Sequence, residues 1–467
     1  MFCLSANAQE ILVSPDINIR SNLGYDIVGK VNDRLVLFRD GGSEHIVQSF
    51  DEEMGITFEG TIFLEDDKAE LYNIVGIDTA FQMIYGYGKK DSIRIMSRVY
   101  NESAELIDST CLFTMDRRLY RKFKYVNSED KSKTLLFSVS RKNRLLYFLI
   151  DNHKRVLKFY GGFEFNEFDI LNDFQTMVIG NDGIGAAYFD SDNMKFSMAD
   201  HKGHLVIFNP STQNGYSYHE IDFDGNLTID SKLNYNNKNR QLVFAGLFSS
   251  INSISSEGYF QLNKPIFQFA EKEKLSYQTF EPGFIGEVIG TKKKKINALN
   301  DLVIKDLILR EDGGIIYFIE SYKEFARRST YRNFTRREAA LYGNQGWVDY
   351  YNEDIIIIST HPDGKEHWKE VLHKKQFSQD DDAIFSSFYI FKTPSRIRLI
   401  YNDEIAKSNT ISEYLIDPIG RYERRSLLNT EYENLKIRFN DAIQLSSNSM
   451  VVPSQQSYNL NLVKISY

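Results

Sequence analysis

The sequence predicts an all-β protein, a β-propeller built from four-stranded antiparallel blades. Two repeats indicate this fold: YDIVG at residues 25–29 returns as YNIVG at residues 72–76, and a hairpin phrase recurs about every 50 residues. Repeats of this length are typical of stacked supersecondary units. The composition agrees, because Phe, Tyr and Trp make up 14% of the chain and Pro occurs only 8 times. Aromatic side chains pack well on pleated sheets.

The hairpin phrase consists of an apolar residue, then Asp or Asn, two further residues, a turn residue and an alternating strand. Asp and Asn bond nearby backbone and Gly supplies positive φ, so these positions predict turns. The phrase occurs at Asp51, Asn101, Asp151, Asp200 and Asp417, with degenerate copies at Gly258 and Gly364. In the first unit the expected strands read YDIVGKV, RLVLFRD, HIVQSFD and ITFEGTIF. We expect YDIVG to be an inner strand whose Ile and Val face neighbouring blades, with Gly where two backbones approach.

The ring is expected to close between the two ends of the chain. Seven turn phrases predict seven blades, and NLKIRFNDAIQLSS, MVVPS and YNLNLVKISY supply about three more strands at the C-terminus. The fourth strand of an eighth blade is expected from EILVSPDINIRS near the N-terminus. Blades in a ring cover each other's faces and leave only short edges. We therefore expect eight blades, with seven as the alternative, and a β-sandwich pair or two smaller propellers as competing architectures.

The first residues are typical of the end of a secretory signal, because a short apolar stretch precedes the cleavage-like pattern Ala6-Asn7-Ala8. We interpret residues 1–8 as a signal peptide remnant and residues 9–467 as a single propeller domain in the periplasm. No later apolar run is long enough to predict a membrane-spanning helix. The other cysteine of the chain lies within residues 1–8, so removal of this segment leaves Cys111 without a cysteine to pair with. The STCLF context of Cys111 predicts a small buried side chain.

The formal net charge of −8 argues against a general nucleic-acid binder, because such proteins neutralise phosphates. The sequence has no G-x-S-x-G, H-E-x-x-H or phosphate-loop pattern, so we expect no catalytic site and no cofactor. His361, His367 and His373 come nearest to a metal site. Zinc needs three or four convergent ligands, and no further His or Cys cluster joins these three, so no metal site is predicted.

An insertion at residues 323–350 interrupts the sixth unit between its second and third strands. It is about 25 residues longer than a hairpin needs, and functional loops tend to occur at such insertions. Its basic and aromatic side chains are of the types enriched at interfaces. They are Phe325, Arg327, Arg328, Tyr331, Arg332, Phe334, Arg336 and Arg337. We predict that they bind a protein partner, with an anionic glycan or a solvated loop as alternatives. Nucleic acid would use similar chemistry, but an exported protein rarely meets it.

The turn STHPDGKEHW ends in Gly364-Lys365-x-x-Trp368, which resembles the end of the docking motif of pyrroloquinoline-quinone-type propellers. The resemblance implies that Trp368 packs between blades, a role that suits a large aromatic anchor. The upstream Ala-x-Asp of that motif is absent, so the resemblance does not imply a quinone site.

The C-terminal third contains LREDGGIIYFIESY, DIIIISTHPDGKEHW, KKQFSQDDDAIFSSFYIF and IRLIYND. Over roughly the last 160 residues it resembles secreted β-propellers of gliding bacteria that use type IX secretion, a family without an agreed active site. The end NLVKISY does not resemble a type IX sorting domain. The resemblance therefore implies a periplasmic subunit docked on an outer-membrane complex, such as the plug component of a type IX translocon. The alternative is a propeller that binds or degrades polysaccharide at the mouth of its central channel.

Overall fold

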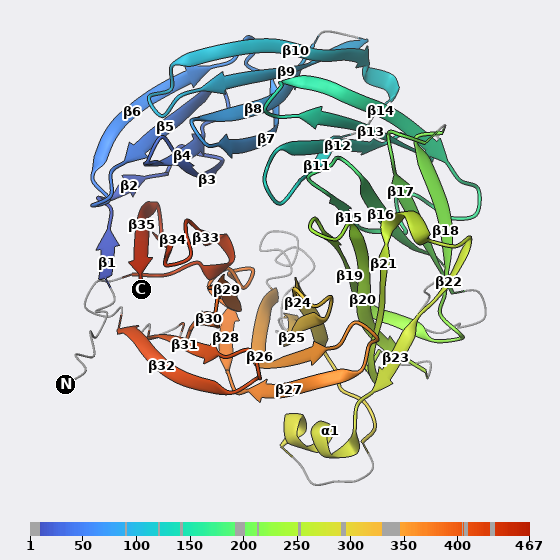
Figure 1. Cartoon of the computed structure of the whole chain (residues 1–467). Coiled ribbons are helices and arrows are strands. Elements are labelled where there is room, and N and C mark those ends of the chain that lie inside the picture. Colours follow the sequence, from blue (N-terminus) through green and yellow to red (C-terminus); the bar gives the residue numbers. More distant parts are fainter. Residues whose placement is uncertain are drawn as a thin grey trace, which may run out of the picture.

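The structure is a computed structural model that describes residues 10–88, 91–119, 122–140, 143–191, 201–212, 214–250, 254–290, 296–328, 346–403, 405, 410–429 and 435–467. The described residues form eight sheets, each based on four antiparallel strands, arranged around a central axis (Figure 1). The protein is therefore an all-β propeller of eight blades, as the repeats predicted. The alternative of seven blades is wrong.

Seven of the blades follow the chain, and each begins with its innermost strand and ends with its outermost strand. The first three blades comprise β3 (Gly24–Val31), β4 (Arg34–Asp40), β5 (Glu44–Phe50), β6 (Ile56–Phe63), β7 (Glu70–Ile77), β8 (Ala80–Tyr87), β9 (Ser92–Tyr100), β10 (Leu106–Asp116), β11 (Lys124–Asn127), β12 (Lys133–Val139), β13 (Arg144–Asp151) and β14 (Val156–Glu164). The fourth and fifth blades comprise β15 (Phe174–Ile179), β16 (Gly185–Ser191), β17 (Lys202–Phe208), β18 (Tyr216–Asp222), β19 (Leu227–Asn236), β20 (Gln241–Ser249), β21 (Gly258–Pro265) and β23 (Ser276–Thr279). The sixth and seventh comprise β24 (Leu302–Leu309), β25 (Ile315–Arg328), β26 (Gly346–Thr360), β27 (Glu366–Leu372), β29 (Phe388–Lys392), β30 (Ile397–Asn402), β31 (Thr410–Ile416) and β32 (Tyr422–Asn429).

The central strands of each blade are buried on both faces, because a neighbouring blade covers each side. The strand β4 contains the run LVLF at residues 35–38, and all four side chains are buried. Val36 and Phe38 join a core cluster with residues of the second blade. Leu35 and Leu37 point the other way and join a cluster with residues of the eighth blade. A continuous apolar run is what a doubly covered strand requires.

The repeated pentapeptides occupy equivalent inner strands, β3 and β7, as the sequence predicted. A Cβ added at Gly76 would lie 2.8 Å from the carbonyl oxygen of Val28 on the neighbouring inner strand. Gly29 has a φ of 110°, a conformation that side chains disfavour. Gly76 therefore permits close approach of neighbouring inner strands, whereas Gly29 permits the positive φ of its own strand.

Five of the seven predicted turns join the third and fourth strands of a blade. They are Asp51, Asn101, Asp151, Gly364 and Asp417. In the first of them, Gly55 N donates to Asp51 Oδ1 at 2.7 Å and Met54 N donates to Asp51 O at 3.1 Å. Met54 takes a left-handed φ of 64°. The side chain at the Asp position thus holds the turn, as expected.

The other two turn phrases are not equivalent to these five. Asp200 lies outside the described residues, but the flanking strands β16 and β17 are the second and third strands of the fourth blade. Gly258 begins β21, the third strand of the fifth blade. The third and fourth strands of the fourth blade are joined instead at Asn209, whose Oδ1 accepts from Ser211 N at 2.9 Å. Every antiparallel hairpin favours similar turn residues, so the phrase alone does not distinguish one hairpin from another.

The eighth blade combines the two ends of the chain, as predicted from EILVSPDINIRS. It comprises β33 (Ile443–Gln444), β34 (Ser449–Gln456), β35 (Asn459–Ser466), β1 (Glu10–Val13) and β2 (Ile17–Asn18). Both N-terminal strands pair antiparallel with β35. Between them, Ser14 N donates to Leu462 O at 2.9 Å, and Leu462 N donates to Ser14 Oγ at 2.9 Å. The ring is therefore closed by hydrogen bonds between its first and last segments.

An ion cluster reinforces the closure between the first and eighth blades. Glu52, in the turn between β5 and β6, accepts from Lys464 of β35 at 2.6 Å and from Lys30 of β3 at 2.8 Å. Lys464 also donates to the carbonyl oxygen of Glu52 at 2.9 Å.

The structure adds elements that the sequence analysis did not identify. They are the helix α1 (Pro282–Ile289), the single turns η1 (Arg117–Leu119), η2 (Ile266–Gln268) and η3 (Phe439–Asp441), and the short strands β22 (Lys272–Lys274) and β28 (Gln376–Gln379). The helix packs Phe284 and Ile285 into the core cluster of the fifth and sixth blades. The segment TRREAALYG, for which the sequence indicates a possible short helix, lies outside the described residues.

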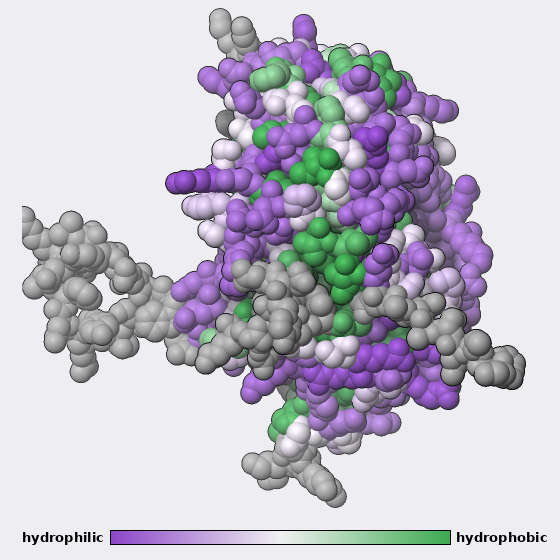
Figure 2. Space-filling view, turned by 90° about the vertical axis from the view of Figure 1, so that its left-hand side faces the viewer, coloured by the Kyte–Doolittle hydropathy of each residue, from purple (hydrophilic) through white to green (hydrophobic). Residues whose placement is uncertain are grey.

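Cys111 is exposed on β10, so the prediction of a buried side chain is wrong. Strand β10 is the outermost strand of its blade, and its residues are all exposed or half-buried. Figure 2 views the outer edge of the ring on the left-hand side of Figure 1 and shows a largely hydrophilic surface with scattered apolar groups. No helix among the described residues is long and apolar enough to cross a membrane.

Candidate functional site

The insertion lengthens the hairpin between β25 and β26, the second and third strands of the sixth blade, as predicted. Strand β24 accompanies β25 only as far as Ser321. Strands β25 and β26 remain paired with each other out to Arg328 and Gly346. Because strand direction alternates, this hairpin lies on the side of the ring where each blade connects to the next, for example through residues 64–69. We call that side the crossover face.

The structure places part of the predicted interface on this hairpin. Phe325 is 51% exposed. The backbones of Arg327 and Arg328 pair with those of Trp347 and Gly346. The remaining predicted residues, Tyr331, Arg332, Phe334, Arg336 and Arg337, lie outside the described residues. Partner binding by this set stays a prediction.

The short strand β28 supports the base of the hairpin by pairing with β26 from Asp349 to Asn352. Tyr351 and Phe377 are directly opposite in this pairing, and their ring centroids lie 5.2 Å apart. Phe377 is 46% exposed. The sequence analysis missed Phe377, although KKQFSQ has the alternation of polar and apolar residues that signals a short strand.

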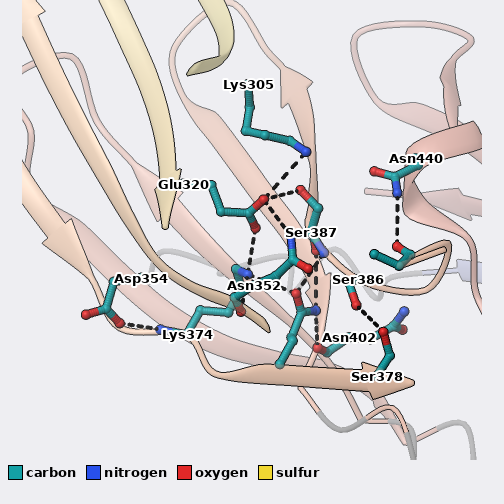
Figure 3. A network of polar contacts seen from close by, with 12 residues as sticks. Lys305, Glu320, Asn352, Asp354, Lys374, Ser378, Ser386, Ser387, Asn402 and Asn440 are labelled. Atoms are coloured by element: carbon teal, nitrogen blue, oxygen red, sulfur yellow. Dashed lines mark hydrogen bonds and ion pairs between the residues drawn. The ribbon is translucent and has the colours of Figure 1, made fainter. Parts of the chain in front are cut away.

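A buried ion pair lies at the base of the hairpin (Figure 3). Lys374 Nζ lies 2.7 Å from Glu320 Oε1, and neither side chain is exposed. Lys374 Nζ also donates to Asn352 O at 3.0 Å and to Gln376 Oε1 at 2.9 Å. Glu320 Oε2 accepts from Asn352 Nδ2 and from Ser387 Oγ, both at 2.9 Å. The ammonium and the carboxylate therefore have the several polar partners that buried charges require.

This network fixes four segments relative to one another. Glu320 belongs to β25, Asn352 to β26, Gln376 to β28 and Ser387 to the segment before β29. Burial lowers the pKa of Lys374, while attraction to Glu320 acts in the opposite direction. Breaking a buried pair by removing one partner is far more costly than the net contribution of the intact pair. The base of the hairpin is therefore held in one arrangement.

The segment between β28 and β29 carries concentrated backbone strain. Asp380, Asp382, Ala383 and Ser387 have left-handed φ values of 53°, 54°, 55° and 71°. Each such non-glycine residue costs roughly 1–3 kcal/mol, and such residues cluster at functional sites. Tyr350 OH donates to Asp382 Oδ1 at 3.1 Å and so ties the strained segment to β26.

Further bonds join this segment to the hairpin and to the eighth blade. Val348 N donates to Asp380 Oδ1 at 2.8 Å, and Asp380 N donates to Val348 O at 3.0 Å. Asn440 Nδ2, in η3, donates to Ala383 O at 3.5 Å. The hairpin, the strained segment and the eighth blade thus form one connected part of the crossover face.

Trp368 packs against the next blade, as its resemblance to a docking motif implied. Its Nε1 donates to Pro418 O at 3.1 Å, in the turn between β31 and β32. A Cβ added at Gly420 would lie 2.7 Å from the Trp368 ring. The indole therefore joins the sixth and seventh blades, and Gly420 leaves room for it.

The three histidines considered for a metal site lie at opposite ends of the sixth blade. His361 and His367 flank the turn between β26 and β27, with ring centroids 4.9 Å apart. His367 Nδ1 contacts Arg310 at 2.7 Å. His373 follows β27 on the crossover face and contacts Asp354 at 3.2 Å. The structure therefore does not bring these three rings together.

The channel mouth opposite the crossover face contains a cavity of about 620 Å³. It is lined by the ends of β11, β15, β19 and β24 and by Lys392. Four of its charged groups form two ion pairs, since Lys238 lies 3.4 Å from Glu311 and Lys392 lies 3.7 Å from Asp306. The polysaccharide alternative placed its site at a channel mouth without specifying which of the two faces.

No protein-family model and no curated protein matches this sequence. Among solved structures, the chain is similar to the Dos1 propeller, with 10% identity and a TM-score of 0.46 over 97% of this chain and 95% of that one. It is similar to the polysaccharide lyase Uly1, with 9% identity and a TM-score of 0.43 over 97% and 99%. It is also similar to a europium-containing methanol dehydrogenase, with 8% identity and a TM-score of 0.44 over 98% and 93%. Similarities at this level concern the fold and carry no argument about activity.

Proposed function

We propose that this protein is a non-enzymatic interaction propeller that docks a partner protein on its crossover face through the β25–β26 hairpin. One observation carries the proposal: the hairpin extends beyond β24, and the hairpin and β28 together expose aromatic side chains above a base with a fully bonded buried ion pair. Phe325 and Phe377 are 51% and 46% exposed. Rigid aromatic side chains are common anchors at interfaces, and a fixed base lowers the entropy cost of binding.

The location follows from the sequence rather than from the fold. We propose that the protein is exported through a cleaved signal peptide and resides in the periplasm. Its partner would be an outer-membrane protein complex, for example a type IX translocon in which it serves as the plug component. The cleavage-like Ala6-Asn7-Ala8 and the resemblance of the C-terminal third support this proposal.

The absence of catalysis is part of the same proposal. The strongest charge cluster at the hairpin base, Glu320 with Lys374, is used internally: both side chains have 0% exposure. Because both side chains are fully buried, they hold the base of the hairpin in place and have no access to a substrate. The observation supports an architectural role for this cluster.

The test is an affinity purification of the tagged, full-length protein from detergent-solubilised envelopes, followed by mass spectrometry. We expect a large outer-membrane protein in near-stoichiometric amount. A double variant, Phe325→Ala with Phe377→Ala, should reduce recovery about tenfold or more, since the loss of a single interface anchor already costs over ~1.4 kcal/mol. Tyr160→Ala is the matched control, because Tyr160 is 67% exposed on β14 of the third blade.

Two results would contradict the proposal. The protein could be recovered alone, or the double variant and the Tyr160→Ala control could retain the partner equally. A second variant set tests the basic part of the insertion. Replacing its arginines with Ala should weaken recovery and reduce its dependence on salt, because exposed charge contacts are screened by ions. These are Arg327, Arg328, Arg332, Arg336 and Arg337.

A further inference from the structure

A cavity of about 650 Å³ lies where the ring closes, between the innermost strands of the eighth and first blades. It is lined by residues 19, 20, 22–27, 438, 440–443, 455, 457 and 458. We call it the seam cavity. Figure 1 shows β3 and β33 on the two sides of the closure. Ligand sites typically occupy roughly 300–1,000 Å³.

The cavity has an identifiable structural origin. The inner strand of the eighth blade is not continuous: an isolated bridge at Ile437 and the two-residue strand β33 are separated by η3. In the first blade the same position is filled by the eight-residue strand β3. The 3-10 turn therefore leaves space beside β3 that a regular strand would fill.

Polar groups around this space are held in place by one another. Arg438 and Asp441, at the two ends of η3, form an ion pair of 2.6 Å. Arg438 also bonds Gln455 Oε1. Tyr25 OH donates to Asp441 Oδ2 at 3.5 Å, and Arg438 lies over the Tyr25 ring at 5.6 Å. Burial is the main reason that the pKa of Tyr25 is raised, so its phenol remains a hydrogen-bond donor.

Two buried donors at the cavity have no hydrogen-bond partner in the described part of the chain. They are Asn22 Nδ2 and Arg438 Nε. A buried donor without a partner costs roughly 1–3 kcal/mol. The cavity walls thus have unused hydrogen-bonding capacity on the donor side.

The open side of the cavity carries an exposed aromatic ring. Tyr458, in the turn between β34 and β35, is 56% exposed. Arg20 lies over one face of its ring at 5.6 Å. An exposed ring beside amides and carboxylates offers an apolar platform next to polar groups.

The charges of the cavity balance. Its lining contains two guanidinium groups, Arg20 and Arg438, and two carboxylates, Asp26 and Asp441. A charged ligand would meet a group of its own sign, and like charges brought together cost free energy. Desolvation and the carboxylates Asp40 and Asp441 raise the pKa of Asp26, so hydroxyl donors would favour its charged form.

We propose that the seam cavity binds a neutral oligosaccharide, with a sugar face on Tyr458 and hydroxyl groups bonded to Asp26 and Asn22. Each sugar hydroxyl both donates and accepts hydrogen bonds. It can therefore donate to the carboxylates, accept from the guanidinium groups and do either with the amides. This inference is independent of the docking role of the hairpin. It also differs from a site at the channel mouth, because the seam cavity lies between two blades.

The test begins with a glycan array carrying neutral and anionic oligosaccharides, probed with the full-length protein. The best neutral oligosaccharide is then titrated by calorimetry. Tyr458→Ala and Asp26→Asn should each raise Kd about tenfold, the effect of losing one good contact. Tyr160→Ala should leave Kd unchanged. Thermal unfolding of each variant confirms that it is folded.

Three outcomes would overturn the inference. Either no neutral glycan binds, or anionic glycans or peptides bind in preference, or Tyr458→Ala and Asp26→Asn both bind as the wild type does. The double variant Phe325→Ala with Phe377→Ala separates this inference from the proposed function. It should bind the oligosaccharide normally while losing the partner protein.

Discussion

Glu320 and Lys374 lie 2.7 Å apart with neither side chain exposed to solvent. Glu320→Ala would leave the Lys374 ammonium buried without its counter-ion. We expect the free energy of unfolding to fall by about 3–5 kcal/mol, measured by urea denaturation. Lys323→Ala is the control, since Lys323 is 56% exposed on the same strand. Equal effects of the two substitutions would show that the buried pair does not hold the hairpin base.

Glu52 predicts how stability depends on pH. Hydrogen bonds from Lys30 and Lys464 lower the pKa of this carboxyl from 4.5 to about 2. Between pH 2 and pH 4.5 the unfolded chain therefore binds more protons at Glu52 than the folded chain does. The stabilisation of the folded state by the ionised Glu52 carboxylate is present above pH 4.5 and is lost toward pH 2. The effect is small, because Glu52 is 58% exposed and water screens the pairs. Glu52→Gln should lower the urea midpoint near pH 6 and have little effect near pH 2; a pH-independent difference would contradict this.

Gly76 tests the close approach of the inner strands. A Cβ at this position would lie 2.8 Å from Val28 O, so Gly76→Ala should destabilise the protein by about 1–3 kcal/mol. Gly283, near the start of α1, has no atom within 4 Å of an added Cβ. Gly283→Ala should instead stabilise the helix by about 0.5–1 kcal/mol. Thermal unfolding of both variants measures these changes in stability. A Gly76→Ala protein as stable as the wild type would show that the inner strands β3 and β7 can move apart freely.

Ser14 tests the closure of the ring. Its Oγ accepts from Leu462 N at 2.9 Å and is buried with it. Ser14→Ala leaves that N–H without its acceptor and should cost about 1–3 kcal/mol. Hydrogen exchange should show faster exchange at Leu462 than in the wild type. Ser43→Ala, in an exposed turn, is the control. Unchanged exchange at Leu462 would mean that water replaces the serine hydroxyl.

The repeats predicted the fold because propeller blades are local structures. Four consecutive strands pair with their chain neighbours, so apolar runs and turns can be read along the sequence. Even the closing strand was predictable, because the C-terminal segments supply about three strands of a blade that needs a fourth. The helix α1 was missed because PGFIGEVI is too short to show a helical period. Its signals were Pro282 at its start and Gly290 after its end, where φ is 67°.

The candidate site was less predictable, because it depends on contacts between distant residues. The insertion, which includes Phe325, could be identified from the sequence because it is long and rich in basic and aromatic residues. Glu320 and Lys374 are 54 residues apart, and their pairing depends on how β25, β26 and the segment after β27 align. Neither residue is distinctive in a chain with 56 Lys and Arg and 64 Asp and Glu. Cys111 was placed wrongly because its strand is outermost, a position that its own sequence does not reveal.

The pairing of Glu10 with Ser466 brings the two ends of the described chain side by side on neighbouring strands. The path of the described strands is thus nearly circular, since residue 10 lies next to residue 466. A short linker from residue 466 to residue 10 would allow new termini to be cut at another exposed connection, such as residues 66–68 between the first two blades. The ring has no intrinsic beginning. A permuted gene of this kind would move the joint between the first and last strands to a different blade.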